Sequence, residues 1–412
     1  MSRLVGDKIG KFLPFLVVAS LVMLYTFVAS RLVDVSFISI FPANFLLFVA
    51  FCIYFKDFKG AKRYQLICIL LFVVDLILVI YNSVNRNLPF TGVDWSNYDY
   101  FAKDALAKSG NIFGIFQNSI DLFTACIATI YKIFGTNITI VYFYILPLSF
   151  ILSHYLYKTV FLITKDKKRS MLFSIIVLLM PVNFIFSLSV LREIPIQCAA
   201  MVSLYFFVSY MFGEKKHGLL LALIFAVLAT LMHSGMIAIP VVYLYVSAQK
   251  KMFKNVKILR VSTFIFAAIL ISLVSLPIFS PLTKRFNMSG GLEGITNSIS
   301  AQNNVLIGYS ATTNYVDGAP TGTLDLILSL PYRMIMFVIA PLPWQINSME
   351  TLVAFFADAI FRYYIVFRVI RTMFRLSKYS VRDREIIDTT FMAVILFDLI
   401  FCLGTTNYGT AM

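Results

Sequence analysis

Three aspartates and several aromatic residues lie together in PFTGVDWSNYDYFAKDALAKSG, residues 89–110, between two long apolar runs. Asp94 follows soon after the first run, and Trp95 and Tyr98 come directly behind it. A carboxylate at such a water edge can act as general base towards a hydroxyl group, and an aromatic ring can stack on the apolar face of a sugar. The alternative is that Asp94 caps a helix at the membrane surface, and both roles can coexist.

Two turns between later apolar runs contain further ionisable residues. Arg192 and Glu193 share the first turn, and the planar guanidinium of an arginine suits the oxygens of a phosphate. His233 lies in the second turn, where it could orient or protonate a reacting group. Asp94, Glu193 and His233 are therefore the candidate catalytic residues. The alternatives are a local salt bridge or headgroup contact for Arg192, and a hydrogen-bonded structural role for His233.

The long segment 279–349 supplies the other candidate binding residues. Lys284 and Arg285 open it, and Arg333 and Trp344 lie near its end. The part between them is rich in Gly, Ser, Thr and Asn, a composition and length typical of a loop that closes over a site. Its cations could stabilise negative charge on a leaving phosphate. The alternative is a disordered loop without such a role.

Membrane-spanning helices must position these residues. The chain of 412 residues is 60% hydrophobic and 13% charged, and this charged share is about half that of a soluble domain. Apolar runs long enough to cross about 30 Å of hydrocarbon recur along the sequence. The predicted spans are 12–30, 37–55, 66–84, 138–162, 171–190, 194–212, 218–232, 236–249, 258–278, 350–370 and 386–403. This pattern predicts an all-α, polytopic integral membrane protein.

The basic residues predict the topology. The net charge is +15, and most Lys and Arg residues cluster in short loops between the runs. Such loops normally face the cytoplasm and contact membrane lipids, so the charge does not indicate nucleic acid as a partner. The segments 85–137 and 279–349 then lie outside. Within them, 119–135 is predicted as an interfacial helix, and 328–346 as an interfacial or re-entrant one.

We predict one integral membrane domain over the whole chain. Its parts are two N-terminal spans (1–65), a core with its outer loop (66–278), a large outer segment (279–349) and C-terminal spans (350–412). The five cysteines are scattered without a pairing or metal-ligand spacing. We therefore predict no metal site and no required cofactor, although a divalent metal held by Asp94 stays an open alternative.

The stretch VDWSNYDYFAKDALAKSGNIF, residues 93–113, resembles the first outer loop of the GT-C class of membrane glycosyltransferases. In that class an Asp after the first core span is followed by a Tyr, a small-residue helix, and interfacial helices that end in an FG-x-N turn. This chain has IFGTN at 133–137, and the order is similar over roughly residues 66–215. The resemblance implies a GT-C-like fold for this chain of about 11 predicted spans, with Asp94 as its catalytic acidic residue.

The Arg192 turn, followed about forty residues later by His233 and Ser234, resembles the EpsG and Wzy families of polysaccharide repeat-unit polymerases. In those families a Gln follows the arginine, and one residue separates the His from the Ser. In this chain Glu193 follows the arginine, and Ser234 follows His233 directly. The resemblance implies a polyprenyl-phosphate or -pyrophosphate sugar donor, a saccharide acceptor and a bacterial cytoplasmic (inner) membrane location with an extracytoplasmic active site. The product would be an envelope polysaccharide, with a chain-length regulator or other envelope assembly proteins as partners.

The alternative function is a lipid-linked oligosaccharide transporter or flippase. Asp75, Asp358 and Asp398 lie within apolar runs and could belong to a proton path. A non-catalytic scaffold is a third option, but it would leave the outer ionisable residues without a role. An enzyme requires the outer candidates to converge in one cavity, whereas a flippase requires a charged passage that reaches both faces.

Overall fold

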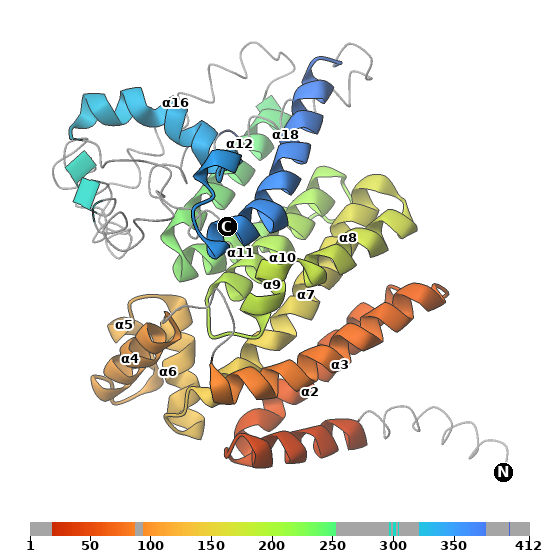
Figure 1. Cartoon of the computed structure of the whole chain (residues 1–412), viewed down its shortest axis with the longest axis vertical. Coiled ribbons are helices and arrows are strands. Elements are labelled where there is room, and N and C mark those ends of the chain that lie inside the picture. The colour runs from red at the N-terminus through yellow and green to blue at the C-terminus, as the bar shows by residue number, and fades with distance from the viewer. Residues whose placement is uncertain are drawn as a thin grey trace. The chain divides into compact units, whose positions relative to one another are not determined.

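A computed structural model describes residues 19–86, 94–252 and 321–375 of the chain, together with six isolated residues, Thr296, Asn297, Ser300, Ala301, Asn304 and Ile395. Every regular element in these ranges is a helix (Figure 1), which confirms the predicted all-α class. The chain divides into two compact units, Met1–His233 and Ser234–Met412. The predicted spans 258–278 and 386–403 lie outside the described ranges, apart from Ile395.

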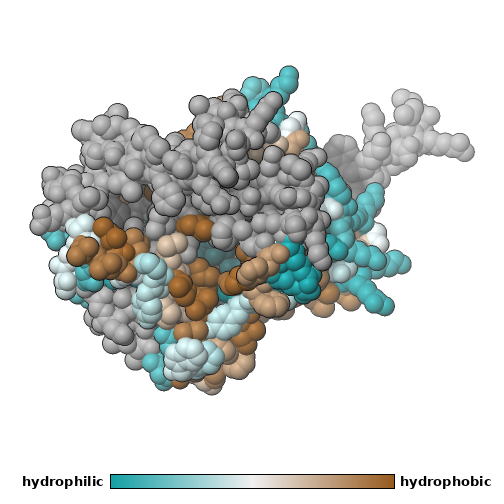
Figure 2. Space-filling model, turned by 90° about the horizontal axis from the view of Figure 1, so that it is seen from above, coloured by the Kyte–Doolittle hydropathy of each residue, from teal (hydrophilic) through white to brown (hydrophobic). Residues whose placement is uncertain are grey.

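Four helices in the described ranges are long and apolar enough to cross a membrane: α2 (Phe37–Lys56), α3 (Lys62–Asn85), α7 (Thr139–Thr164) and α10 (Glu193–Met211). Each coincides with a predicted span to within a few residues. Figure 2 shows hydrophobic residues on the outer surface of the described part, as expected for a surface that contacts lipid. By length and composition the protein is a membrane protein, and the total of about 11 spans stays a prediction.

Helix α7 is the central helix of the first unit. In the most apolar stretch of α7, 72% of the residues are buried, whereas in that of α3 only 33% are. Helix α7 packs against α2, α3 and α10. Three phenylalanines join these layers, because Phe51 of α2 stacks on Phe72 of α3 with ring centroids 3.9 Å apart and both rings meet Phe150 of α7 edge-on. Aromatic pairs of this geometry stabilise a core beyond their buried area.

Helix α11 (Gly218–Met232) packs closely against α10 through small residues. Ala222, Ala226 and Ala229 are fully buried along one stripe of α11. A Cβ atom added at Gly218 would lie only 2.7 Å from the carbonyl oxygen of Phe206. Small residues allow two membrane helices to approach in this way. Helix α11 covers the predicted span 218–232 with the same bounds.

The predicted continuous span 171–190 is interrupted. Helix α8 (Lys167–Leu179) ends before Met180, and α9 (Pro181–Ser187) begins at a proline. Proline lacks the backbone N–H that a continuing helix needs, and its fixed φ suits the first position of a new helix. The chain then turns back towards α10 through residues 188–192.

In the second unit, α18 holds the end of α16 by three hydrogen bonds. The elements are η1 (Ser234–Ile237), α12 (Ala238–Met252), α16 (Thr323–Ile339), η4 (Pro343–Gln345), α17 (Met349–Ala354), the π-helix η5 (Phe355–Ala359) and α18 (Ile360–Met373). Arg362 donates to the carbonyl oxygens of Phe337 and Ala340, and Tyr363 to that of Pro341. The predicted segment 328–346 is thus a helix that ends before Pro341, and its position in the membrane stays a prediction.

Candidate functional site

A three-helix insertion contains most of the candidate chemistry of the first unit. It comprises α4 (Asp94–Ala107), α5 (Ile112–Asn118) and α6 (Leu122–Phe134). The two ends of the insertion lie close together, because the start of α7 is hydrogen-bonded to the end of α3. Thr139 of α7 accepts a hydrogen bond from Arg86 and donates one to the carbonyl oxygen of Ser83. The insertion therefore lies at one end of two membrane-length helices.

Helices α4 and α6 form a tightly packed pair. Ala102 and Ala105 of α4 are buried, which allows the close approach. Tyr98 meets Phe123 of α6 edge-on, with ring centroids 5.0 Å apart. Tyr98, whose ring we predict to stack on a sugar, is thus part of the packing between these two helices. Asp94 is the first residue of α4, whereas an N-cap residue precedes the first helical position. Its side chain lies outside the described part, so both its capping role and its catalytic role stay predictions.

A partly buried hydrogen bond joins the same two helices. The hydroxyl of Tyr131, which is 2% exposed, donates to Oδ1 of Asp99 at 2.5 Å. Lys103 Nζ lies 2.7 Å from the other carboxylate oxygen. Burial raises the pKa of Tyr131, and the hydrogen bond to Asp99 and its charge raise it further. Tyr131 therefore stays protonated and acts as a donor.

Arg86 holds Trp95 at the start of α4. Arg86 ends α3 in a left-handed conformation, with φ 53°. Its guanidinium carbon lies 4.7 Å from the ring centroid of Trp95, a cation–π contact. Within the described part, its buried Nε has no hydrogen-bond partner. Arg86 was missed from sequence, although a lone arginine at the outer end of a predicted span was a signal for it.

Arg192 pairs with the first turn of α6. Arg192 Nη1 lies 3.4 Å from Oδ2 of Asp121, and Asp121 caps α6 by accepting the backbone N–H of Thr124 at 2.8 Å. The alternative stated for Arg192 is a local salt bridge, whereas this one is formed with a residue 71 positions away in the sequence. The contact involves only Nη1, and the buried Nε of Arg192 has no hydrogen-bond partner among the described residues.

The two turns that contain the other candidates also adjoin this insertion. Glu193 is the first residue of α10, and the preceding turn is held to α3 by a hydrogen bond of 2.7 Å from Asn82 to the carbonyl oxygen of Leu188. His233 caps α11, its N–H bonded to the carbonyl oxygen of Ala229. Helix α11 packs against α6. Helix α6, with its capping residue Asp121, thus contacts three parts of the first unit: α4, the Arg192 side chain, and α11, which His233 caps.

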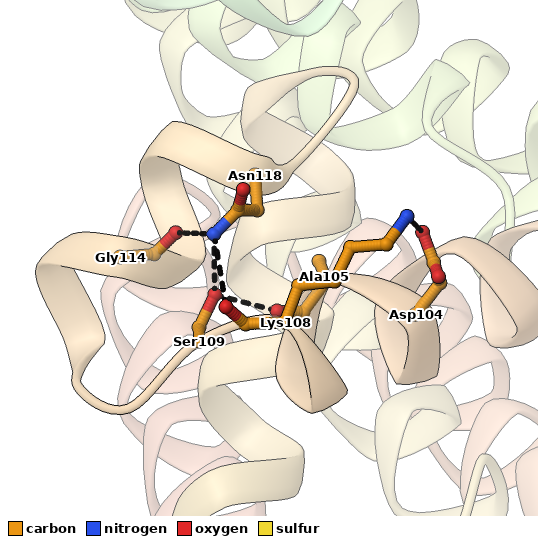
Figure 3. Close-up of polar contacts among 6 residues, drawn as sticks. All are labelled: Asp104, Ala105, Lys108, Ser109, Gly114 and Asn118. Atoms are coloured by element: carbon orange, nitrogen blue, oxygen red, sulfur yellow. Dashed lines mark hydrogen bonds and ion pairs between the residues drawn. The ribbon is translucent and has the colours of Figure 1, made fainter.

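Polar contacts hold α5 against the end of α4 (Figure 3). Asn118 donates to the carbonyl oxygens of Lys108 and Gly114 and to the hydroxyl of Ser109. Asp104 forms an exposed ion pair with Lys108 at 2.6 Å. Asp104 is therefore engaged at the surface of α4, which makes it a matched reference for Asp94 on the same helix.

The remaining candidates belong to the second unit or lie outside the described residues. Arg333 of α16 is 1% exposed, and its Nε donates to Ser329 Oγ at 3.2 Å. Trp344 in η4 is 78% exposed. Lys284 and Arg285 lie outside the described part. The convergence of Arg333 with Asp94, Arg192 and His233 therefore stays a prediction.

Within the described ranges, no group of three or more His, Cys, Asp or Glu residues is placed to hold a metal ion. Scans against protein-family models, curated proteins and solved structures found no match to the chain. The resemblance of residues 93–113 and of the Arg192 and His233 turns to known families thus rests on those residues alone.

Proposed function

We propose that this protein is a membrane glycosyltransferase of GT-C-like fold with about 11 spans, located in the bacterial inner membrane. It would transfer a sugar or oligosaccharide from a polyprenyl-phosphate or -pyrophosphate donor at the extracytoplasmic face. The proposed product is a lengthened envelope polysaccharide, such as an O-antigen, a capsule or an exopolysaccharide. The observation that supports this most is the position of α6, which contacts α4, the Arg192 side chain and α11.

The proposed roles follow from the chemistry of each side chain. Asp94 removes the proton from the acceptor hydroxyl, and Trp95 offers a ring surface to the saccharide. Arg192 binds the donor phosphate and stabilises the charge that develops on it. His233 and Glu193 orient or protonate the reacting groups. Arg333, Lys284, Arg285 and Trp344 would complete the binding site, and no metal is needed for these steps.

Arg192 is suited to the phosphate role even though it is already paired. The contact of 3.4 Å to Asp121 is longer than the about 2.7–2.9 Å of a charge-assisted hydrogen bond. The pair is partly buried, with side-chain exposures of 21% for Arg192 and 6% for Asp121, so water screens it little. Asp121 therefore holds the guanidinium in place while its other donors stay available for an anion. We expect Asp121→Asn to weaken donor binding by loosening Arg192.

The test is an extension assay in proteoliposomes with a polyprenyl-linked oligosaccharide as the only saccharide. Wild-type protein should produce longer lipid-linked chains, and Asp94→Asn should abolish the extension without loss of folded protein. Asp104→Asn is the matched control, because it removes the same charge from the same helix at an exposed ion pair. Equal activity of both variants would refute the assignment of Asp94.

A flippase is the second candidate, and Asp75 favours it. Asp75 lies within α3, is 3% exposed and has an Oδ1 atom with no hydrogen-bond partner in the described ranges. Buried acids inside membrane helices often belong to transport paths. The side chains of Asp358 and Asp398 lie outside the described part. Transfer of a labelled lipid-linked saccharide between leaflets, without extension and with sensitivity to Asp75→Asn, would favour this candidate over the transferase.

A further inference from the structure

Two lysines contact the ring of Tyr205 from different elements of the first unit. Lys158 is on α7, and its Nζ lies 5.7 Å from the ring centroid of Tyr205. Lys215 follows α10, and its Nζ lies 5.0 Å from the same centroid. The rings of Tyr155 and Phe206 contact Lys158 and Lys215 at 5.5 and 4.8 Å, respectively. We call these five residues the Tyr205 cluster.

The two ammonium groups of the cluster have no carboxylate partner in the part of the chain that the structure describes. Glu214 is next to Lys215 in the sequence, but it pairs with Lys165 at 3.4 Å. Like charges that share one ring repel each other, and the ring quadrupole attracts each ammonium only weakly. The hydroxyl of Tyr205 makes no hydrogen bond within the described residues. The cluster therefore offers two cations and a hydroxyl donor to an anion.

The depth of the cluster indicates a lipid rather than a soluble anion. Lys158 lies less than two turns before Thr164, the last residue of α7, so its Cα is about 9 Å of helix below that end. A lysine at this depth extends its ammonium to the headgroup region. Apolar residues are exposed on α7, on α10 and on α11, which follows the Lys215 turn, with 40% for Phe161, 36% for Leu204 and 60% for Leu220. These residues provide contacts for acyl chains.

We propose that the Tyr205 cluster binds the phosphate of an anionic membrane lipid, with Lys158 and Lys215 as its charged contacts. The site is distinct from the candidate site around α6, because Lys158 and Thr139 lie near opposite ends of α7, about 28 Å apart along the helix. It does not depend on the proposed transferase function. The bound lipid joins α7 to the turn after α10 and stabilises that pair.

Native mass spectrometry of the full chain tests the proposal with phosphatidylglycerol and phosphatidylcholine as probes. Wild-type protein should retain phosphatidylglycerol more tightly than phosphatidylcholine. Each lysine near an anionic headgroup changes affinity by about fivefold, so Lys158→Met with Lys215→Met should weaken phosphatidylglycerol binding by about 25-fold. Binding of phosphatidylcholine should not change. Lys167→Met with Lys168→Met is the control, because it removes two charges from the start of α8, which follows the end of α7 in the sequence.

The outcomes separate the possible anions. An equal loss of phosphatidylglycerol in both double variants would overturn the proposal, because only general surface charge would then act. Displacement of the lipid by millimolar inorganic phosphate would overturn the lipid assignment in favour of soluble phosphate. If the double variant does not fold, the single variant Lys215→Glu replaces it, since Lys215 is in an exposed turn. Retained selectivity for phosphatidylglycerol in that variant would also refute the site.

Discussion

The hydrogen bond between Tyr131 and Asp99 gives the sharpest prediction about the insertion. Replacing Tyr131 by phenylalanine removes this bond of 2.5 Å and leaves the ring in its buried position. A hydrogen bond to a charged group contributes about 1.5–3 kcal/mol. The ion pair of Asp99 with Lys103 cannot replace it, because Lys103 is 48% exposed and such pairs on a helix contribute about 0.5 kcal/mol or less.

The assay is hydrogen–deuterium exchange of α4 amides in lipid nanodiscs. A loss of about 1.5–3 kcal/mol corresponds to an increase of about 10- to 150-fold in the opening equilibrium of α4. Tyr100→Phe is the control, because Tyr100 is on the same helix and is 66% exposed. Asp99→Asn completes a double-mutant cycle that isolates the pair. If the α4 amides of the Tyr131→Phe variant exchange no faster than those of the Tyr100→Phe variant, the bond between Tyr131 and Asp99 does not hold α4 against α6, and the reasoning is refuted.

Three further predictions concern packing, pH and lipid contact. Gly218→Ala should destabilise the protein by about 1–3 kcal/mol in thermal unfolding, because its Cβ would meet the Phe206 carbonyl at 2.7 Å, whereas Gly110→Ala, with nothing within 4 Å, should not. Folding raises the pKa of Tyr131, so the neutral phenol is favoured in the folded state. Protection of the α4 amides from exchange should therefore be constant between about pH 6 and pH 10 and fall above that range. Tyr131→Phe should remove this fall. A photoactivatable lipid should label Phe113, which is 71% exposed on α5, and a label confined to α3 would contradict an interfacial insertion.

The membrane-length helices could be predicted because their limits are set by local chemistry. Residues 37–55 and 66–84 are apolar runs separated by lysines and an arginine, and the helices end within a few residues of these limits. The break at Pro181 could not be predicted in the same way. An apolar run with one proline is also compatible with a continuous membrane helix, and only the packing around Pro181 decides between them.

The polar contacts of the candidate site join residues that are far apart in the sequence, so no local sequence pattern predicts them. Arg192 and Asp121 are separated by 71 positions, and Tyr131 and Asp99 by 32. Each pair forms because α6 folds back on α4 and against the turn before α10. From its residue type alone, Arg192 could be predicted to bind a negatively charged group. Which group it pairs with depends on this tertiary arrangement. The roles of Asp94 and His233 stay predictions.

The most direct test of the central claim is the length of the lipid-linked saccharide made by wild-type and Arg192→Ala proteins in sealed proteoliposomes. Both proteins should first show the same amount of folded material. Our account predicts extension by the wild type and a loss of at least tenfold in the variant, because the donor phosphate loses its guanidinium contact. Undiminished extension by Arg192→Ala, or movement of unextended lipid across the bilayer by the wild type, would contradict it.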